Sequence, residues 1–356
     1  RLRVRSDSGF IRDFEQMIPD IPAESSVLVE KPGIILDSHF LVSITEPLTA
    51  SFRVSVLRDE EELAAHEYEI QILTYEQWQG FKFLPETISS FIMPNHPAVP
   101  QLMHRASEYL TNWGQEPMLE GYQMRDPNRA RMLAAAAYAA IQEKNIIYAM
   151  PPSSFMLGQR VRLPDAVMEQ HMGTCLDMTF LYAALLEAMG LNPILVLMEG
   201  HIFAGLWLVD SSFQDVIIED PVELEKRMSD GINEITFVEC TAMCSGKTLS
   251  FEEAEKYAKT EVGDYADFQF AFDVARSRAL GIRPMPARVR NDSGYEIIHT
   301  ERSEDDVTEL PDELENIIPE DQPEKKITKL DIWERKLLDL SMRNMLLNMR
   351  MTKSII

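Results

Sequence analysis

The segment from residue 173 to residue 190 constrains the fold most strongly. It opens with Gly173-Thr-Cys-Leu-Asp177 and continues as an apolar stretch up to Gly190. Apolar side chains would surround most of a helix formed here: Phe180, Leu181, Ala183, Ala184, Leu185, Ala188 and Met189. A helix that is apolar on nearly all sides must be buried. The spacing of Thr174 and Asp177 resembles a capping box, with Asp where Glu or Gln is commoner, and Gly190 suits the residue after a helix. The sequence therefore predicts a central helix with Cys175 in its first turn.

A cysteine in the first turn of a helix has distinctive chemistry. The first backbone N–H groups lack partners within the helix, and together with the positive end of the helix dipole they stabilise a thiolate. The sulfur of Cys175 would then be nucleophilic near neutral pH. The alternative is an inert buried cysteine, which is common for this residue type.

Two strands joined by a tight turn are predicted after this helix. The first runs from Asn192 to Met198, and the second from His201 to Val209. A histidine that opens a strand lies near the mouth of the sheet, where it can reach a thiol on a helix packed against that sheet.

A third strand, from Ile235 to Thr241, supplies the best candidate for a supporting acid. If this strand runs antiparallel beside the one that begins at His201, its end brings Glu239 next to the imidazole. Asp210 is nine residues along the strand from His201, about 30 Å away at about 3.3 Å per residue. Asp220, in an intervening loop, remains the alternative acid.

These residue types predict nucleophilic catalysis. His201 would take the thiol proton, Cys175 would attack an acyl carbon to form a thioester, and Glu239 would orient and stabilise the charged imidazole. The backbone N–H of Cys175 and the side-chain amide of Gln159 are candidate oxyanion donors. Three further residues are expected to line the site: Asp177, His171 and Trp207.

A metal or cofactor is not expected. Cys240 and Cys244 form a single Cys-x-x-x-Cys without a second pair nearby, which is a weak zinc signal. The histidines other than His201 lack partners at ligand spacing. An odd total of three cysteines does not suit a secreted disulfide framework, so a reducing cytoplasm is the expected location.

The rest of the chain predicts an α+β protein with several parts. Residues 1–80 contain short strand-like stretches separated by turn residues, which predict an immunoglobulin-like β-sandwich: Val27–Glu30, Phe40–Ile44, Ser51–Leu57 and Tyr68–Leu73. Helical periods follow at 97–111 and 128–143, and a long loop at 150–164 leads to the cysteine segment. We expect one cysteine-containing domain over residues 81–290.

Residues 291–325 predict an acidic disordered linker, and residues 326–356 predict an amphipathic helix that needs a missing neighbour. The chain begins at Arg1 and stops at Ile356 just after this helix, so we expect it to be part of a longer protein. Its net charge of −24 argues against direct nucleic-acid binding and against docking on an anionic membrane. No apolar run approaches the length of a spanning helix.

Three segments together resemble transglutaminase-like domains of the papain-type cysteine protease superfamily. They are Gly173-Thr-Cys-Leu-Asp177, Gly200-His-Ile-Phe-Ala-Gly-Leu-Trp207 and Val238-Glu-Cys-Thr241. The family commonly has aspartate at the third place, where this chain has Glu239. The resemblance covers the chain from Pro151 to about Pro286. It implies a central helix packed on an antiparallel sheet, with Cys175, His201 and Glu239 as a catalytic triad.

A narrower resemblance concerns large bacterial helicase-related multidomain proteins. It rests on Pro152-Ser-Ser-Phe155, Gly158-Gln-Arg-Val-Arg-Leu-Pro164, Leu185-Leu-Glu-Ala-Met-Gly-Leu-Asn-Pro193 and the segment from Trp333 to Asn348. The last segment resembles the opening of an uncharacterised domain that precedes the helicase core in such proteins. The resemblance implies a larger protein, with a function in genome defence, in which the C-terminal helicase-related region is a partner of this one.

The expected activity is cysteine-dependent acyl transfer on a protein or peptide substrate. A protease or amidase is favoured over a cross-linking transglutaminase, although the same three side chains serve both. Two alternatives remain. The first is a non-catalytic module that binds a peptide in the cleft and regulates the helicase part, and the second is a scaffold.

Overall fold

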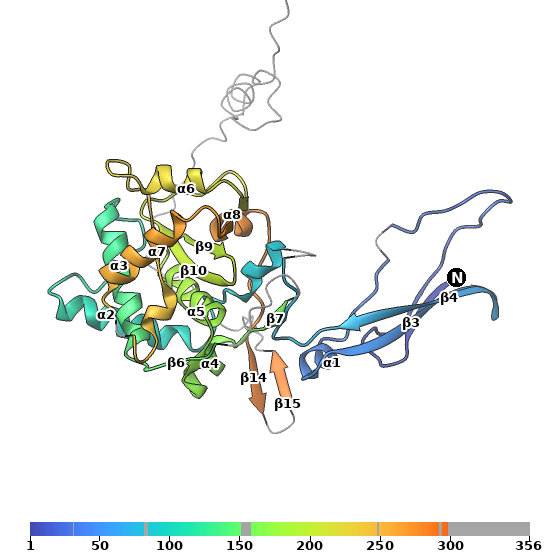
Figure 1. Cartoon of the computed structure of the whole chain (residues 1–356). Helices are drawn as coiled ribbons and strands as arrows, with labels where there is room; N and C mark the ends of the chain where they lie inside the picture. Colours follow the sequence, from blue (N-terminus) through green and yellow to red (C-terminus); the bar gives the residue numbers. More distant parts are fainter. Residues whose placement is uncertain (31, 82–84, 151–157, 248, 292–293, 298–356) are drawn as a thin grey trace, which may run out of the picture. The chain divides into compact units, whose positions relative to one another are not determined.

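The computed structural model describes residues 1–297 except 31, 82–84, 151–157, 248 and 292–293 (Figure 1). The described residues all belong to one of the two units into which the chain divides, Arg1–His299. They form a mixture of helices and mainly antiparallel sheets, which confirms the α+β class. The amphipathic helix predicted at 326–356 and most of the predicted acidic linker lie outside the described residues. The linker was predicted to begin at residue 291, but a hairpin of β14 (Arg288–Asn291) and β15 (Gly294–Ile297) occupies that position.

The N-terminal part is one four-stranded antiparallel sheet. Its strand order is β2 (Phe14–Gln16), β1 (Leu2–Ser6), β3 (Leu48–Arg58) and β4 (Glu61–Ile72). A small core lies against it, made of Val4, Phe10, Ile11, Ile44, Ala50 and Ile72. The predicted β-sandwich is wrong for the described residues of 1–80, which contain no second sheet facing this one. In β4, every residue before Ile72 is exposed, whereas a facing sheet would bury alternate residues.

Two of the four strands predicted in this part are also wrong. The stretch Phe40–Ile44 lies mostly in helix α1 (Ser38–Ser43), because the Asp37 carboxylate accepts a hydrogen bond from the backbone N–H of Phe40 and caps a helix there. Val27–Glu30 has no regular structure. The stretches Ser51–Leu57 and Tyr68–Leu73 are confirmed, apart from Leu73 itself, as parts of β3 and β4.

The cysteine domain is built on a five-stranded antiparallel sheet. The strand order is β11 (Ile217–Ile218), β13 (Phe268–Asp273), β9 (Pro193–Met198), β10 (His201–Trp207) and β12 (Ile235–Val238). Side chains of β10 alternate between two cores: Ile202, Ala204 and Leu206 join the core that contains α5, and Phe203 and Trp207 join the other. The sheet is therefore covered on both faces. The antiparallel pairing of β9 with β10 confirms the predicted strand pair.

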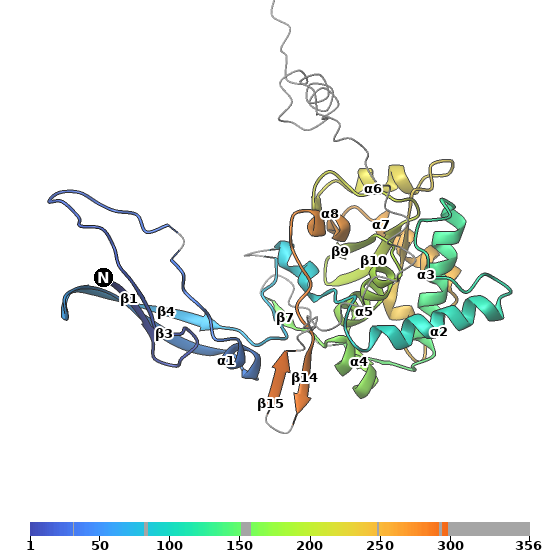
Figure 2. The same ribbon diagram turned by 180° about the vertical axis from the view of Figure 1, so that it is seen from behind.

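The helix α5 (Cys175–Ala188) is the centre of this domain. Its residues from Cys175 to Leu186 are all buried, as the apolar sequence predicted. It packs against β9 and β10, and helices α2 (Val99–Asn112) and α3 (Pro127–Gln142) pack against it in turn (Figures 1 and 2). The small alanines of α3 allow close approach, so that the Tyr182 hydroxyl of α5 donates a hydrogen bond of 2.9 Å to the carbonyl of Ala134.

The remaining elements connect or cover these layers. The helices are η1 (Pro85–Phe91), α4 (Pro164–Gln170), α6 (Pro221–Met228), η2 (Cys240–Met243), α7 (Phe251–Val262) and α8 (Val274–Ala279). Two short strand pairs join distant segments: β5 (Gln77–Trp78) with β7 (Gln159–Arg160), and β6 (Ile147–Tyr148) with β8 (Met172–Gly173). Among the described residues, no helix has both the length and the apolar character needed to cross a membrane.

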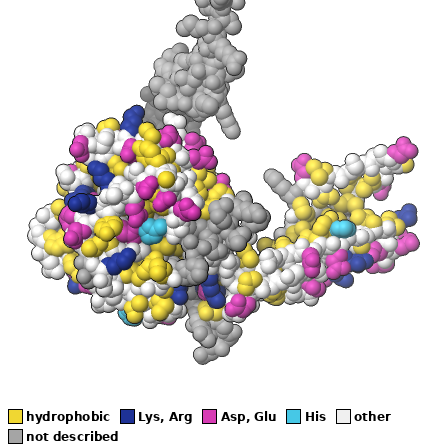
Figure 3. Space-filling view, viewed as in Figure 1, with side chains coloured by type: hydrophobic (Ala, Val, Ile, Leu, Met, Phe, Trp, Pro, Cys, Tyr) yellow, Lys and Arg dark blue, Asp and Glu magenta, His cyan; other side chains and the backbone are white. Residues whose placement is uncertain are grey.

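Acidic side chains are distributed over the visible surface rather than gathered at one place. Figure 3 shows Asp and Glu side chains on both the N-terminal sheet and the cysteine domain, with Lys and Arg among them. This distribution accompanies the net charge of −24. An extended basic face of the kind that binds nucleic-acid phosphates is not visible in this view.

Candidate active site

A complete capping box fixes the start of α5. The Thr174 hydroxyl accepts a hydrogen bond of 3.2 Å from the N–H of Asp177, and the Asp177 carboxylate accepts one of 2.9 Å from the N–H of Thr174. Cys175 is therefore the first residue of the helix, as predicted, and its N–H has no acceptor within the helix. Its side chain is 8% exposed.

Asp177 holds a neighbouring segment instead of lining the site. Its fully buried carboxylate also accepts hydrogen bonds from the backbone N–H of Arg162 at 2.8 Å and from the guanidinium of Arg162 at 3.2 Å. These bonds occupy both carboxylate oxygens. Asp177 therefore ties residue 162 to the first turn of α5.

Tyr148 lies beside Cys175 and was missed in the sequence. The parallel pairing of β6 with β8 sets Tyr148 opposite Gly173, two residues before the cysteine. The Tyr148 side chain lies close enough to the Cys175 thiol to interact with it electrostatically. Burial, followed by the neighbouring thiol, raises the pKa of Tyr148. Because a two-residue pairing between distant segments has no local sequence pattern, only the structure reveals this contact.

His201 and Glu239 are in direct contact. The Nε2 atom of His201 lies 2.6 Å from Oε2 of Glu239, and the second carboxylate oxygen accepts a hydrogen bond of 2.8 Å from the N–H of Thr241. Glu239 follows β12 and caps η2, so the strand predicted to reach Thr241 ends at Val238. The carboxylate is thus fixed at one oxygen by the backbone and at the other by the imidazole.

The imidazole of His201 connects Glu239 with Cys175. The ring of His201 forms a hydrogen bond with Glu239 and lies close enough to Cys175 to interact with it electrostatically. Nε2 is the ring nitrogen that faces Glu239. The structure therefore brings together the three residues that the sequence singled out.

The electrostatics of the three residues favour a charged imidazole. Burial lowers the pKa of His201, but its hydrogen bonds to Cys175 and Glu239 and their negative charges outweigh burial and raise the pKa to about 10. Burial likewise raises the pKa of Glu239, but its hydrogen bond to His201 and the imidazolium charge give a net lowering. The pair is thus an imidazolium and a carboxylate at neutral pH.

A second carboxylate lies close to the same imidazole. Oε2 of Glu261, near the end of α7, is 3.8 Å from Nε2 of His201. This oxygen is buried and has no hydrogen-bond partner. Burial raises the pKa of Glu261, with a further increase from the Glu239 charge, while the charges of His201 and Lys247 oppose it.

The alternative acid is engaged elsewhere. Asp220 begins helix α6, where its carboxylate accepts a hydrogen bond of 3.0 Å from the N–H of Val222. Within the described part of the chain, the carboxylates that His201 contacts are those of Glu239 and Glu261, and not that of Asp220. Geometry therefore selects Glu239.

Two of the residues expected to line the site have other partners. Trp207 is fully buried and donates a hydrogen bond of 3.0 Å to Asp273. It is six residues along β10 from His201, about 20 Å at about 3.3 Å per residue. Trp207 shares a face of the sheet with His201, but the distance along the strand keeps it out of the candidate active site. His171 is exposed, ends α4 with a left-handed φ of 48°, and contacts the carbonyl of Lys144 through Nδ1 at 2.9 Å.

Gln159 has no contact with Cys175 among the described residues. It is half-buried and pairs through the backbone with Trp78 in the β5–β7 ladder. Residues 151–157, which precede it, are not among those described. The role of its side-chain amide as an oxyanion donor stays a prediction.

The other two cysteines are in different surroundings. Cys240 is buried, and burial raises the pKa of its thiol. Burial also raises the pKa of Cys244, to about 11, although the charge of Lys247 opposes this. Because the pKa of each is raised, neither thiol ionises readily near neutral pH.

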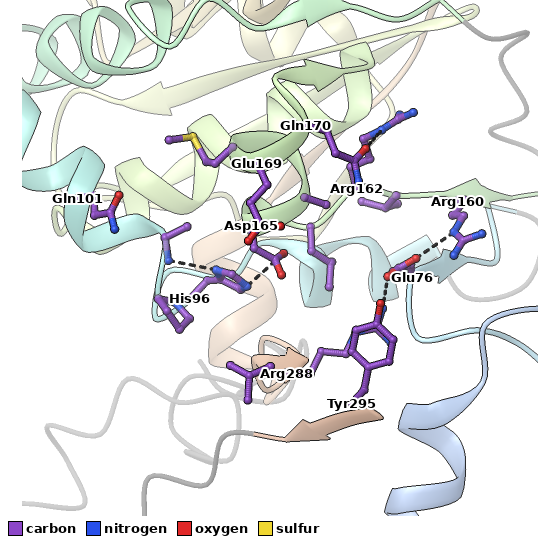
Figure 4. A pocket seen from close by; sticks show the side chains of 17 residues that line it. Glu76, His96, Gln101, Arg160, Arg162, Asp165, Glu169, Gln170, Arg288 and Tyr295 are labelled. Carbon is purple, nitrogen blue, oxygen red and sulfur yellow. Dashed lines mark hydrogen bonds and ion pairs between the residues drawn. The ribbon is translucent and has the colours of Figure 1, made fainter. Parts of the chain in front are cut away.

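A cavity of about 860 Å³ lies apart from the three residues. Figure 4 shows a polar contact at each end: His96 with Asp165 at 3.5 Å, and the ion pair of Arg160 with Glu76 at 2.9 Å. Burial lowers the pKa of His96, and the charge of Asp165 opposes this. None of Cys175, His201 and Glu239 lines the cavity, so it is separate from the candidate active site.

Comparison with known proteins does not add an identity. The chain matches no protein-family model, no curated protein and no solved structure. An inference about its function therefore depends on the arrangement of Cys175, His201 and Glu239.

Proposed function

We propose that this chain is a cysteine-dependent acyl-transfer enzyme that acts on a protein or peptide. The single observation that carries the proposal is the position of His201, whose Nε2 lies 2.6 Å from Oε2 of Glu239 and whose ring interacts electrostatically with Cys175. A structural histidine has no need of both a helix-start thiol and a buried carboxylate. A catalytic one does, because it must accept the thiol proton and remain oriented while charged.

The chemical steps follow from these positions. The thiol proton of Cys175 rests on His201, which is an imidazolium at neutral pH, and the sulfur attacks the carbonyl carbon of an amide. The negative oxygen that forms is stabilised by the unpaired N–H of Cys175. His201 then returns the proton to the leaving amine, which leaves a thioester that a water or a second amine resolves.

Hydrolysis is favoured over cross-linking within this proposal. Water needs no binding site of its own, whereas an amine donor needs a second subsite. The resemblance to transglutaminase-like domains supports the acyl-transfer class, and the helicase-related setting in a larger protein belongs to the same proposal. The segment from Trp333 to Asn348, which carries that second resemblance, lies outside the described residues.

The test is selective alkylation of the three cysteines. The protein is treated with iodoacetamide at pH 7, and the modification rates of Cys175, Cys240 and Cys244 are followed by peptide mass spectrometry. We expect Cys175 to react at least about tenfold faster than the other two, because thiolates are the reactive species. His201→Ala should remove this difference, whereas the matched control His171→Ala should preserve it. Equal slow rates for all three cysteines would contradict the proposal.

One observation favours a second candidate function. The Cys175 side chain is 8% exposed, and none of the described cavities is lined by it. A module that binds a peptide without cleaving it would tolerate such a covered thiol. An electrophilic peptide probe separates the two functions, because covalent labelling of Cys175 requires access, whereas reversible binding that survives Cys175→Ala does not.

A further inference from the structure

His201, Glu239 and Glu261 present three possible metal ligands to one point. Nε2 of His201 and one carboxylate oxygen from each glutamate all lie within 4.8 Å of one another. They come from three different elements: β10, the cap of η2, and α7. This separation of 38 and 22 residues along the chain explains why no ligand spacing is visible in the sequence.

Glu261 is the unusual member of this group. Its Oε2 atom is buried without a hydrogen-bond partner and faces a second carboxylate, although a buried carboxylate oxygen normally has a donor. The contact with His201 at 3.8 Å is too long to be a hydrogen bond. A cation between the two glutamates would satisfy this oxygen and relieve the repulsion between the carboxylates.

We propose that His201, Glu239 and Glu261 form a binding site for a divalent transition metal, with Zn²⁺ as its representative, and that the bound metal inhibits the acyl-transfer site. One imidazole nitrogen with two carboxylate oxygens is a ligand set that suits Zn²⁺ and disfavours Mg²⁺, which prefers oxygen alone. Ligand atoms around tetrahedral Zn²⁺ are about 3.4 Å apart for bonds of about 2.1 Å. The distances of 2.6 and 3.8 Å from Nε2 bracket this value, so small side-chain rotations are sufficient.

The inhibition follows from the proton positions on the imidazole, and this part rests on the proposed function. A metal ligand must be a neutral imidazole, and a metal on Nε2 places the remaining proton on Nδ1. A metal-bound His201 therefore cannot be the imidazolium that gives a proton to the leaving amine. The metal also takes Glu239 away from its role as the partner of the charged ring. Metal and catalysis therefore compete for the same histidine.

Direct Zn²⁺ binding is the test, with Zn²⁺ alone as the probe and the whole chain of residues 1–356. Binding is measured by calorimetry and by competition with a chromogenic chelator. Wild type and Cys175→Ser should both bind one equivalent with similar affinity, because the thiol is not a ligand. Glu261→Gln should weaken binding at least about tenfold. The control Glu252→Gln changes an exposed glutamate of the same helix and should bind like wild type.

Three outcomes would overturn the proposal. They are the absence of saturable binding at one equivalent, an unchanged affinity in Glu261→Gln, and a loss of binding in Cys175→Ser, which would assign the metal to the thiol and imidazole. Glu261→His retains a ligand atom and should bind more tightly than Glu261→Gln, so that a folding defect is distinguished from a lost ligand. If the protein proves to have no acyl-transfer activity, the Zn²⁺ binding measurements on wild type and variants still test the metal site. If it is active, Zn²⁺ should inhibit with the midpoint measured for binding.

Discussion

Nε2 of His201 lies 2.6 Å from Oε2 of Glu239, although 38 residues separate them in the chain. The antiparallel register of β10 and β12, in which Ala204 lies opposite Val238, carries Glu239 to the start of β10. At this distance the contact is a charge-assisted hydrogen bond, which is stronger than one between neutral groups. Each side chain therefore stabilises the charged form of the other.

Replacing Glu239 by Gln should lower the pKa of His201. The change removes the carboxylate charge and leaves a side chain of nearly the same shape, so the imidazolium loses its carboxylate partner. We expect the histidine pKa, measured by NMR titration, to fall from about 10 towards its ordinary value, and the alkylation rate of Cys175 at pH 7 to fall about tenfold or more. Asp220→Asn is the matched control and should leave both unchanged. An unaltered histidine titration in Glu239→Gln would contradict the assigned pairing.

The stability of the protein should depend on pH through His201. Its pKa in the folded state is raised to about 10 from 6.5, so protonated His201 stabilises the folded state. This contribution is complete below pH 6.5 and is lost as the pH rises through about 10. The lowered pKa of Glu239 acts in the opposite direction: its contribution is present above pH 4.5 and is lost in acid.

Urea denaturation at several pH values measures this dependence. The difference in free energy of unfolding between wild type and His201→Ala should be largest near pH 6 and should shrink towards pH 10. His104→Ala changes an exposed histidine and should give a difference that is flat over the same range. A wild-type advantage that grows with rising pH would mean that the sign of the His201 shift is wrong.

Tyr148→Phe should slow the reaction of Cys175. The substitution removes the hydroxyl, which is the group that interacts with the thiol, and keeps the ring in place. A hydrogen bond to a charged group contributes about 1.5–3 kcal/mol, so we expect an alkylation rate at pH 7 about tenfold lower. Tyr257→Phe, on the exposed surface of α7, should have no effect. A faster reaction in Tyr148→Phe would instead show that the hydroxyl shields the sulfur.

Gly205→Ala should destabilise the sheet beside the candidate site. A Cβ atom at this position would lie 2.6 Å or less from two carbons of the Phe237 ring. The ring on β12 would have to move, which costs about 1–3 kcal/mol in a packed core. Gly263→Ala is the control, since its added carbon meets backbone atoms at 3.4 Å or more. Equal unfolding free energies for the two variants would show that Phe237 moves without cost.

Local sequence patterns predicted the centre of the molecule well. The capping residues around Cys175, the apolar surface of α5 and the strand pair that carries His201 are all confirmed, because each depends on neighbouring residues in the chain. Glu239 also followed from local pattern, since the end of one antiparallel strand must meet the start of its neighbour.

Contacts made by distant segments were not predictable in the same way. Tyr148 reaches Cys175 through a pairing of two-residue strands, and Glu261 reaches His201 from a separate helix. The β-sandwich and the strand predicted in the N-terminal part were wrong for a related reason. Its strand-like stretches had the right alternation, but Asp37 turned one of them into a helix, and alternation alone does not say whether a second sheet covers the first.

The position of β12 at the edge of the sheet predicts the order in which parts of the candidate site unfold on heating. It is an outer strand, with a neighbour in the sheet on one side only, whereas α5 is enclosed by other elements. Edge strands open at lower free energy than buried helices. The carboxylate that follows β12 should thus separate from the imidazole while the helix that bears the thiol is still folded. The fast alkylation of Cys175 should then be lost at a lower temperature than the one at which the domain melts.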